Sequence, residues 1–66
     1  MFNDEFYTEV DLEVFVKLIV NTDNKEYQVI ENIYPEDIDY ENVEFLSPVI
    51  FKSLIKGLDV EGFKRI

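Results

Sequence analysis

The chain has 66 residues, with no cysteine, no histidine and a formal net charge of −9 from 15 acidic and 6 basic side chains. A chain of this length forms a single domain, residues 1–66, whose core is only marginally sufficient and has no disulfide or thiolate–metal site to reinforce it. Six Phe and four Tyr nevertheless favour a folded domain over disorder, and no apolar run approaches the roughly 20 residues that a membrane span needs.

The first predicted element is one long strand from Thr8 to Val20. Apolar residues alternate along it with a period of two, which is typical of a strand with one buried face: Val10, Leu12, Val14, Val16, Leu18 and Val20. Residues 21–24 have turn-forming side chains, and residues 25–33 predict a second strand, with a bulge or an early end near Ile30. The two segments together predict a β-hairpin.

A loop and a short strand are predicted next. Pro35 ends the second strand, because proline has no N–H to donate to a strand ladder. Residues 36–41 then predict a loop or a single helical turn. Val43 to Leu46 predicts a short third strand.

An amphipathic helix is predicted after this strand. Ser47 suits the N-cap and Pro48 the first helical position, and Leu46 and Phe51 occupy the positions of a hydrophobic staple. The helix is expected to run to about residue 56, with Gly57 placed to end it. Its apolar stripe is Ile50, Phe51, Leu54, Ile55 and Leu58.

The tail, residues 59–66, fits two structures. Val60, Phe63 and Ile66 have the spacing of a helical turn, whereas residues 62–66 fit a final edge strand, which we favour. The predicted architecture is α+β: a small antiparallel sheet, made of a β-hairpin plus one or two short strands, with one amphipathic helix packed on it.

The residue inventory argues against an enzyme. No histidine is present for proton transfer near neutral pH, so the two serines, Ser47 and Ser53, have no histidine base to activate them. Two glycines are too few for a phosphate-binding loop. Carboxylates alone remain compatible with a glycosidase pair or a magnesium site, but residues 21–24 lack the spacing of a calcium loop. We expect no catalytic residue, no cofactor and no metal site.

The distribution of charge is more informative. Thirteen of the 15 acidic residues lie in residues 1–46 against two lysines, giving −11, while residues 47–66 carry +2. On the predicted first strand, Glu9, Asp11 and Glu13 would project from one face at intervals of about 6.6 Å, similar to the separation of successive phosphates in a nucleic acid. A second acidic cluster contains no basic residue: Glu31, Glu36, Asp37, Asp39, Glu41 and Glu44. The clusters indicate either a surface for a basic partner or solvated faces that maintain solubility.

Four apolar side chains are candidate anchors for a partner. Phe15 and Ile19 lie on the strand face that begins acidic, and Tyr34 and Tyr40 lie in the acidic loop. The structural alternative, which we favour for Phe15 and Ile19, is that the helix or an N-terminal aromatic residue covers them. The candidates for that cover are Phe2, Phe6 and Tyr7.

The chain resembles the small acidic inhibitors that phages and other mobile elements encode against host nucleic-acid enzymes. These include anti-CRISPR proteins, anti-restriction proteins and uracil-DNA glycosylase inhibitors, several of which are DNA mimics. The likeness to the short phage glycosylase inhibitors lies in the hairpin at residues 18–27 and the acidic segment 36–41, about a third of the chain; the helical segment after Ser47 is extra. The resemblance implies an acidic face that competes with nucleic acid for the groove of a target enzyme.

We therefore expect a non-enzymatic inhibitor that binds the basic surface of a nucleic-acid-binding host enzyme. We expect it to act in the cytoplasm of a bacterial host and to have no membrane partner. Direct nucleic-acid binding is not expected, because Lys52, Lys56, Lys64 and Arg65 stand against an overall charge of −9. The alternatives are an acidic accessory, immunity or antitoxin-like binding module, or a structural homodimer.

Overall fold

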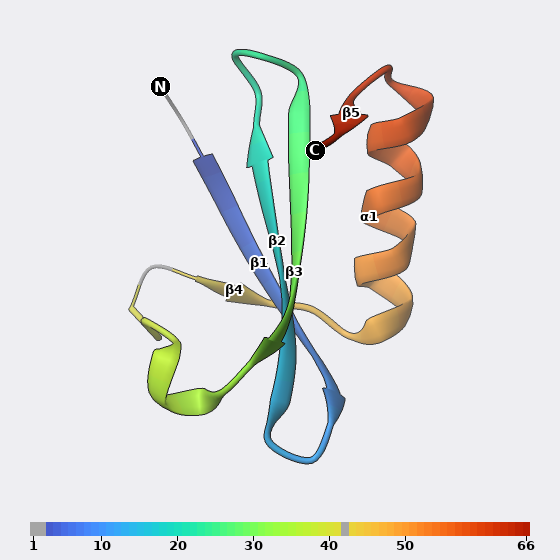
Figure 1. The fold of residues 1–66 in the computed structure, drawn as a ribbon. Coiled ribbons are helices and arrows are strands. Elements are labelled where there is room, and N and C mark those ends of the chain that lie inside the picture. The colour runs from blue at the N-terminus through green and yellow to red at the C-terminus, as the bar shows by residue number, and fades with distance from the viewer. Residues whose placement is uncertain (1–2, 42) are drawn as a thin grey trace.

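The computed structural model describes residues 3–41 and 43–66. Within them, a five-stranded sheet in the order β4-β1-β2-β3-β5 carries one α-helix on one face (Figure 1). The elements are β1 (Asn3–Asp11), β2 (Val14–Asn21), β3 (Glu26–Ile33), the 3-10 turn η1 (Pro35–Asp37), β4 (Glu44–Phe45), α1 (Pro48–Val60) and β5 (Lys64–Arg65). The predicted α+β class is confirmed. The prediction of a purely antiparallel sheet is wrong, because β4 and β5 run parallel to β1 and β3.

The single strand predicted over Thr8–Val20 is two strands. β1 ends at Asp11, residues 12–13 form a turn and β2 begins at Val14. In this pairing Phe6 lies opposite Leu18 and Thr8 opposite Val16, so even-numbered residues of both strands share one face. The apolar alternation therefore continues in phase across the turn and conceals it. The left-handed position of the turn is filled by Glu13 (φ 56°) rather than by a glycine that would have marked it.

The predicted hairpin is confirmed as β2 and β3. The Asn21 side chain accepts hydrogen bonds from the backbone N–H groups of Asp23 (3.1 Å) and Asn24 (3.2 Å), which is the local turn chemistry expected of asparagine. The predicted bulge is also present. The register shifts where Phe15 and Lys17 of β2 face Ile33 and Ile30 of β3.

The start of α1 follows the prediction from sequence. The Ser47 Oγ accepts a hydrogen bond from the backbone N–H of Ile50 (3.3 Å), and Pro48 is the first helical residue. Phe51 is buried in the core cluster and Leu46 packs against that cluster, which confirms the two apolar partners of the predicted staple.

The end of α1 differs from the prediction. The helix continues through Gly57 to Val60, because a single glycine costs only about 1 kcal/mol in a helix that tertiary packing supports. Gly62, with φ 92°, supplies the left-handed turn after the helix. The favoured strand interpretation of the tail is confirmed by β5, where the N–H of Lys64 bonds the carbonyl of Lys25.

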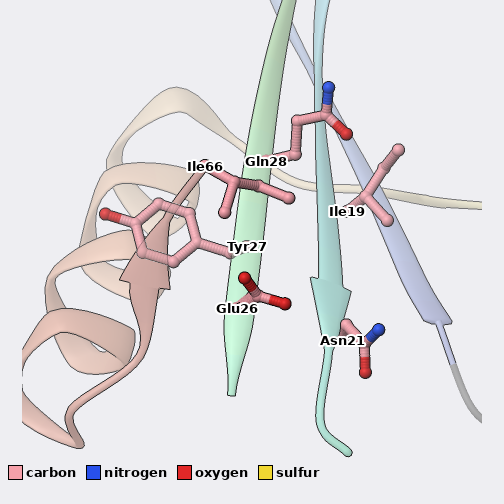
Figure 2. A pocket seen from close by; sticks show the side chains of 6 residues that line it. All are labelled: Ile19, Asn21, Glu26, Tyr27, Gln28 and Ile66. Carbon is pink, nitrogen blue, oxygen red and sulfur yellow. The ribbon is translucent and has the colours of Figure 1, made fainter. Parts of the chain in front are cut away.

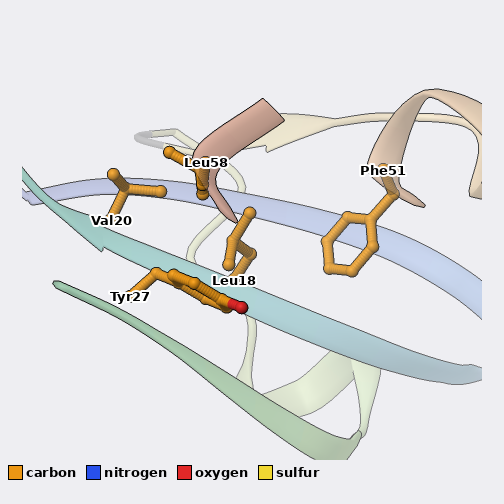
Figure 3. Close-up of a cluster of buried hydrophobic side chains, with 5 residues drawn as sticks. All are labelled: Leu18, Val20, Tyr27, Phe51 and Leu58. Carbon is orange, nitrogen blue, oxygen red and sulfur yellow. The ribbon is translucent and has the colours of Figure 1, made fainter. Parts of the chain in front are cut away.

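The main core lies between α1 and the sheet. Leu18 and Val20 of β2 and Tyr27 of β3 pack against Phe51 and Leu58 of the helix, as Figure 3 shows. The remaining stripe residues Leu54 and Ile55 pack against this cluster, but Ile50, predicted on the same stripe, is exposed. Large side chains in this core partly offset the small size of the domain.

The other face of the sheet has a second, aromatic cluster. Tyr7 of β1 is buried there, with its ring 5.7 Å from that of Phe45 in β4. The ring of Phe15 packs edge-on against that of Phe45, with 5.9 Å between the ring centroids. The ring of Tyr40 stacks on the ring of Phe45 at 5.5 Å. These contacts attach the segment between β3 and β4 to the sheet.

Candidate functional site

The strand register brings the two acidic segments to one end of the sheet. Glu9 of β1 lies opposite Phe15 of β2, which lies opposite Ile33 of β3, so the β1–β2 turn and the exit from β3 are neighbours. Both are at the bottom of Figure 1. We call eight exposed acidic residues of these segments the acidic end: Glu9, Asp11, Glu13, Glu31, Glu36, Asp37, Asp39 and Glu41. The ninth predicted residue, Glu44, is not brought there, because β4 places it beside Phe6, near the middle of β1.

The eight carboxylates reach this end from different elements. The three of the first segment lie in β1 and in the β1–β2 turn. Glu31 lies near the end of β3, and Glu36 and Asp37 lie in η1. Asp39 and Glu41 follow in the loop, where the Asp39 Oδ1 accepts a hydrogen bond from the N–H of Glu41 (3.1 Å).

The lysines of the acidic half do not neutralise this end. Lys17 forms a salt bridge with Glu5, which is not part of the acidic end, with Nζ 2.7 Å from Oε1. The hydrogen bond to Glu5 raises the pKa of Lys17. Lys25 lies in the β2–β3 turn, at the opposite end of the sheet. Apart from Asp39, no member of the acidic end forms an ion pair with lysine or arginine among the described residues.

The predicted row of Glu9, Asp11 and Glu13 along one strand face is wrong. The register shifts between Glu9 and Asp11, and Glu13 lies beyond β1 in the turn. The Asp11 Oδ1 also accepts a hydrogen bond from the N–H of Leu12 (2.7 Å), which turns its carboxylate towards the turn. The three carboxylates therefore surround the tip of a hairpin and have no regular spacing of phosphates.

The aromatic anchor candidates divide into packed and exposed side chains. Phe15 is half-buried by its contact with Phe45, so its cover comes from β4 rather than from the helix. Tyr7 belongs to the same cluster, Phe6 lies on the opposite face and Phe2 lies outside the described residues. Tyr34 and Tyr40 are 47% and 58% exposed, next to the acidic end.

Ile19 is not brought to the acidic end. It lies on β2 opposite Glu5 and Gln28, and it lines a shallow hollow of about 240 Å³ towards the other end of the sheet. Figure 2 shows this hollow, where Ile19 and Asn21 of β2 stand beside Glu26 and Gln28 of β3. The remaining lining residues are Tyr27 and Ile66.

A feature that sequence reasoning missed is an apolar groove between α1 and the β1–β2 hairpin. We call it the helix–hairpin groove; its volume is about 200 Å³ and it is lined by Thr8, Val10, Val16, Pro48, Phe51, Lys52 and Ile55. Val10 is 56% exposed and Leu12, at the hairpin tip, is 85% exposed. In the sequence, Val10 and Leu12 belong to the apolar alternation that predicts a buried strand face. No sequence signal therefore indicates this groove.

The described residues show neither a metal-binding cluster nor a helix that could span a membrane. Within residues 3–41 and 43–66, no three His, Cys, Asp or Glu side chains are grouped so that they could hold a metal ion. No helix in the described part of the chain is long and apolar enough to cross a membrane. Comparison with models of protein families, with curated proteins and with solved structures finds no match.

Proposed function

We propose that this protein is a non-enzymatic inhibitor that occupies the basic nucleic-acid groove of a host enzyme with its acidic end. The observation that supports this most is the convergence of eight exposed carboxylates from two segments on one end of the sheet. A concentrated negative potential steers association with a positively charged groove and strengthens it at low salt.

The structural cost of this arrangement supports a binding role. Like charges crowded at one end destabilise a compact domain that is already small. Of the two lysines in the acidic half of the chain, Lys17 pairs with Glu5 and Lys25 lies at the opposite end of the sheet. A partner that supplies lysine and arginine would relieve this repulsion on binding.

A second candidate is an accessory, immunity or antitoxin-like module whose partner has no nucleic-acid groove. The exposed rings of Tyr34 and Tyr40 beside the carboxylates favour it, because tyrosine is a common anchor at protein interfaces. A homodimer through the acidic end is disfavoured, since it would place two sets of carboxylates against each other.

The test is affinity capture from a bacterial lysate on the immobilised chain, followed by elution with duplex DNA or RNA. We expect nucleic-acid-binding enzymes that elute with nucleic acid, whose activity the free chain inhibits. The Glu9→Lys/Asp11→Lys/Glu13→Lys variant should reduce inhibition by about 100-fold, because reversed charges repel a basic groove by several kcal/mol. Inhibition should also weaken steeply with added salt.

The matched control is Asp4→Lys/Asp23→Lys/Glu61→Lys, which makes the same change in net charge with exposed residues outside the acidic end. It should keep inhibition within a few-fold of the original chain. Equal losses in both variants would indicate a response to net charge and contradict the assignment of the site. Partners that nucleic acid does not elute would favour the accessory or immunity module.

A further inference from the structure

The helix–hairpin groove is open to solvent along an apolar strip. Its floor is formed by Val16 of β2 and Phe51 and Ile55 of α1, and Val10 and Leu12 extend the apolar surface to the tip of the hairpin. In a domain with so few residues for its core, two large aliphatic side chains left in water forgo burial that could stabilise the fold.

The two sides of the groove carry opposite charges. The hairpin side is negative at its tip, where the exposed residues Asp11 and Glu13 flank Leu12. Glu9 pairs with Phe15 and lies on the opposite face of the sheet. The helix side has Lys52, which is exposed. An occupant that matches this pattern has an apolar side chain for the groove and basic side chains next to it, on the side of the hairpin tip.

We infer that the helix–hairpin groove binds a basic segment of a partner protein and takes one aliphatic side chain of that segment, such as leucine. The basic neighbours of that side chain meet Asp11 and Glu13. This inference rests on the proposed function, because it specifies how the partner of the acidic end is held. Apolar anchoring also adds a contact that salt does not screen.

A second copy of the chain fits the groove less well than a basic segment. The groove adjoins two carboxylates of the hairpin tip, Asp11 and Glu13, and a twofold contact would place them close to those of the other copy. The chain as a whole carries −9, which adds repulsion at longer range.

The test uses two synthetic pentapeptides with blocked ends, Lys-Arg-Leu-Arg-Lys and Lys-Arg-Ser-Arg-Lys, titrated into the isotopically labelled chain at fixed salt. The serine peptide measures attraction to carboxylates alone. We expect the leucine peptide to bind at least about fivefold more tightly, because partial burial of one leucine side chain is worth that factor. Its resonance shifts should be largest at Val10, Val16 and Ile55.

Two pairs of variants locate the effect. Val10→Ser should remove the advantage of the leucine peptide, whereas Val60→Ser, at an exposed valine near the end of α1, should retain it. Lys52→Glu should strengthen binding of the leucine peptide by more than Lys64→Glu does, although both change the net charge equally. All four positions are exposed, so these variants are expected to fold.

Equal affinities of the two peptides for the original chain would overturn the inference. So would an advantage of leucine that survives Val10→Ser, or shifts confined to residues outside the groove. Light scattering that shows a dimer dissociated by Val10→Ser would assign the groove to a second copy and also overturn it. In each case, binding of the serine peptide that depends on Glu9, Asp11 and Glu13 would leave the proposed function of the acidic end standing.

Discussion

The two ends of the sheet differ in how their charges are arranged. At the acidic end, eight exposed carboxylates gather from the end of β1 and the turn after it, and from the end of β3 and the segment after it. At the opposite end, which we call the mixed end, β5 brings Lys64 and Arg65 beside the start of β3, next to Lys25. There Lys64 is in register with Glu26, so charges of both signs are neighbours.

This difference shows that the acidic residues are not distributed evenly over the surface, as a role in solubility alone would predict. Most of the acidic residues of the first 46 positions also gather in space. This is because β1 and β3 both flank β2, so that the turn after β1 and the segment after β3 lie at the same end of the sheet. The mixed end can satisfy its charges internally, whereas the acidic end depends on solvent, salt or a partner.

The largest expected effect comes from truncating Phe51, which holds the first half of α1 over the sheet next to the acidic end. Phe51→Ala should destabilise the domain by about 3–5 kcal/mol, since it removes a buried aromatic ring from a small core. Val60→Ala, at an exposed site near the mixed end, should change stability by less than about 0.5 kcal/mol. Urea denaturation followed by circular dichroism measures both, and a loss below about 1 kcal/mol for Phe51→Ala would contradict the described packing.

Neutralising part of the acidic end should stabilise the protein. Glu36→Gln/Asp37→Asn/Glu41→Gln is expected to raise the free energy of unfolding by about 1 kcal/mol at low salt, because it relieves repulsion between exposed charges. The gain should shrink as salt is added. The same number of neutral substitutions outside that end, Asp4→Asn/Glu26→Gln/Glu61→Gln, should give no gain. Equal gains would remove the distinction between the two ends.

Thr8, on the floor of the helix–hairpin groove, offers a smaller test. It is only 2% exposed, and its hydroxyl has no hydrogen-bond partner among the described residues. Thr8→Val should therefore stabilise the fold by up to about 1 kcal/mol, because it replaces an unsatisfied buried hydroxyl with a methyl group of similar size. Thermal unfolding compared with Thr22→Val, in the exposed β2–β3 turn, provides the control; a destabilised Thr8→Val would show that the hydroxyl is satisfied in solution.

The smallest expected effect is a pH dependence near the mixed end. The Tyr27 hydroxyl donates a 2.6 Å hydrogen bond to the Asp59 carboxylate, and this bond raises the pKa of Tyr27 above its usual value of 10.0. Because the folded pKa is raised, the stabilisation is complete below the unfolded pKa and is lost as pH rises through the folded one. The melting temperature of Tyr27→Phe should lie slightly below that of the original chain near about pH 8, and the gap should close as pH rises through the folded pKa of Tyr27. A gap that stays constant over this range would contradict the role of the hydroxyl.

Local side-chain chemistry explains the parts of the fold that the sequence predicts correctly. The turn after β2 follows from Asn21, which bonds the next backbone N–H groups, and the start of α1 follows from Ser47 and Pro48. These signals act over three or four residues and need no knowledge of distant contacts.

Non-local pairing explains what the sequence does not predict. The turn at Leu12 and Glu13 is hidden because alternation stays in phase across it, and the parallel direction of β4 and β5 depends on how the chain returns to the sheet. For the candidate site, the acidic residues themselves could be chosen from charge alone. Their meeting at one end, the separation of Ile19 from it and the helix–hairpin groove all depend on strand register.

The outer strands β4 and β5, each only two residues long, have a consequence for the behaviour of the protein in concentrated solution. They cover short stretches of the borders of β1 and β3 and offer an incoming chain almost no ladder to extend. Together with dense negative charge, such brief outer strands oppose fibril growth. We therefore expect the protein to stay monodisperse at millimolar concentration.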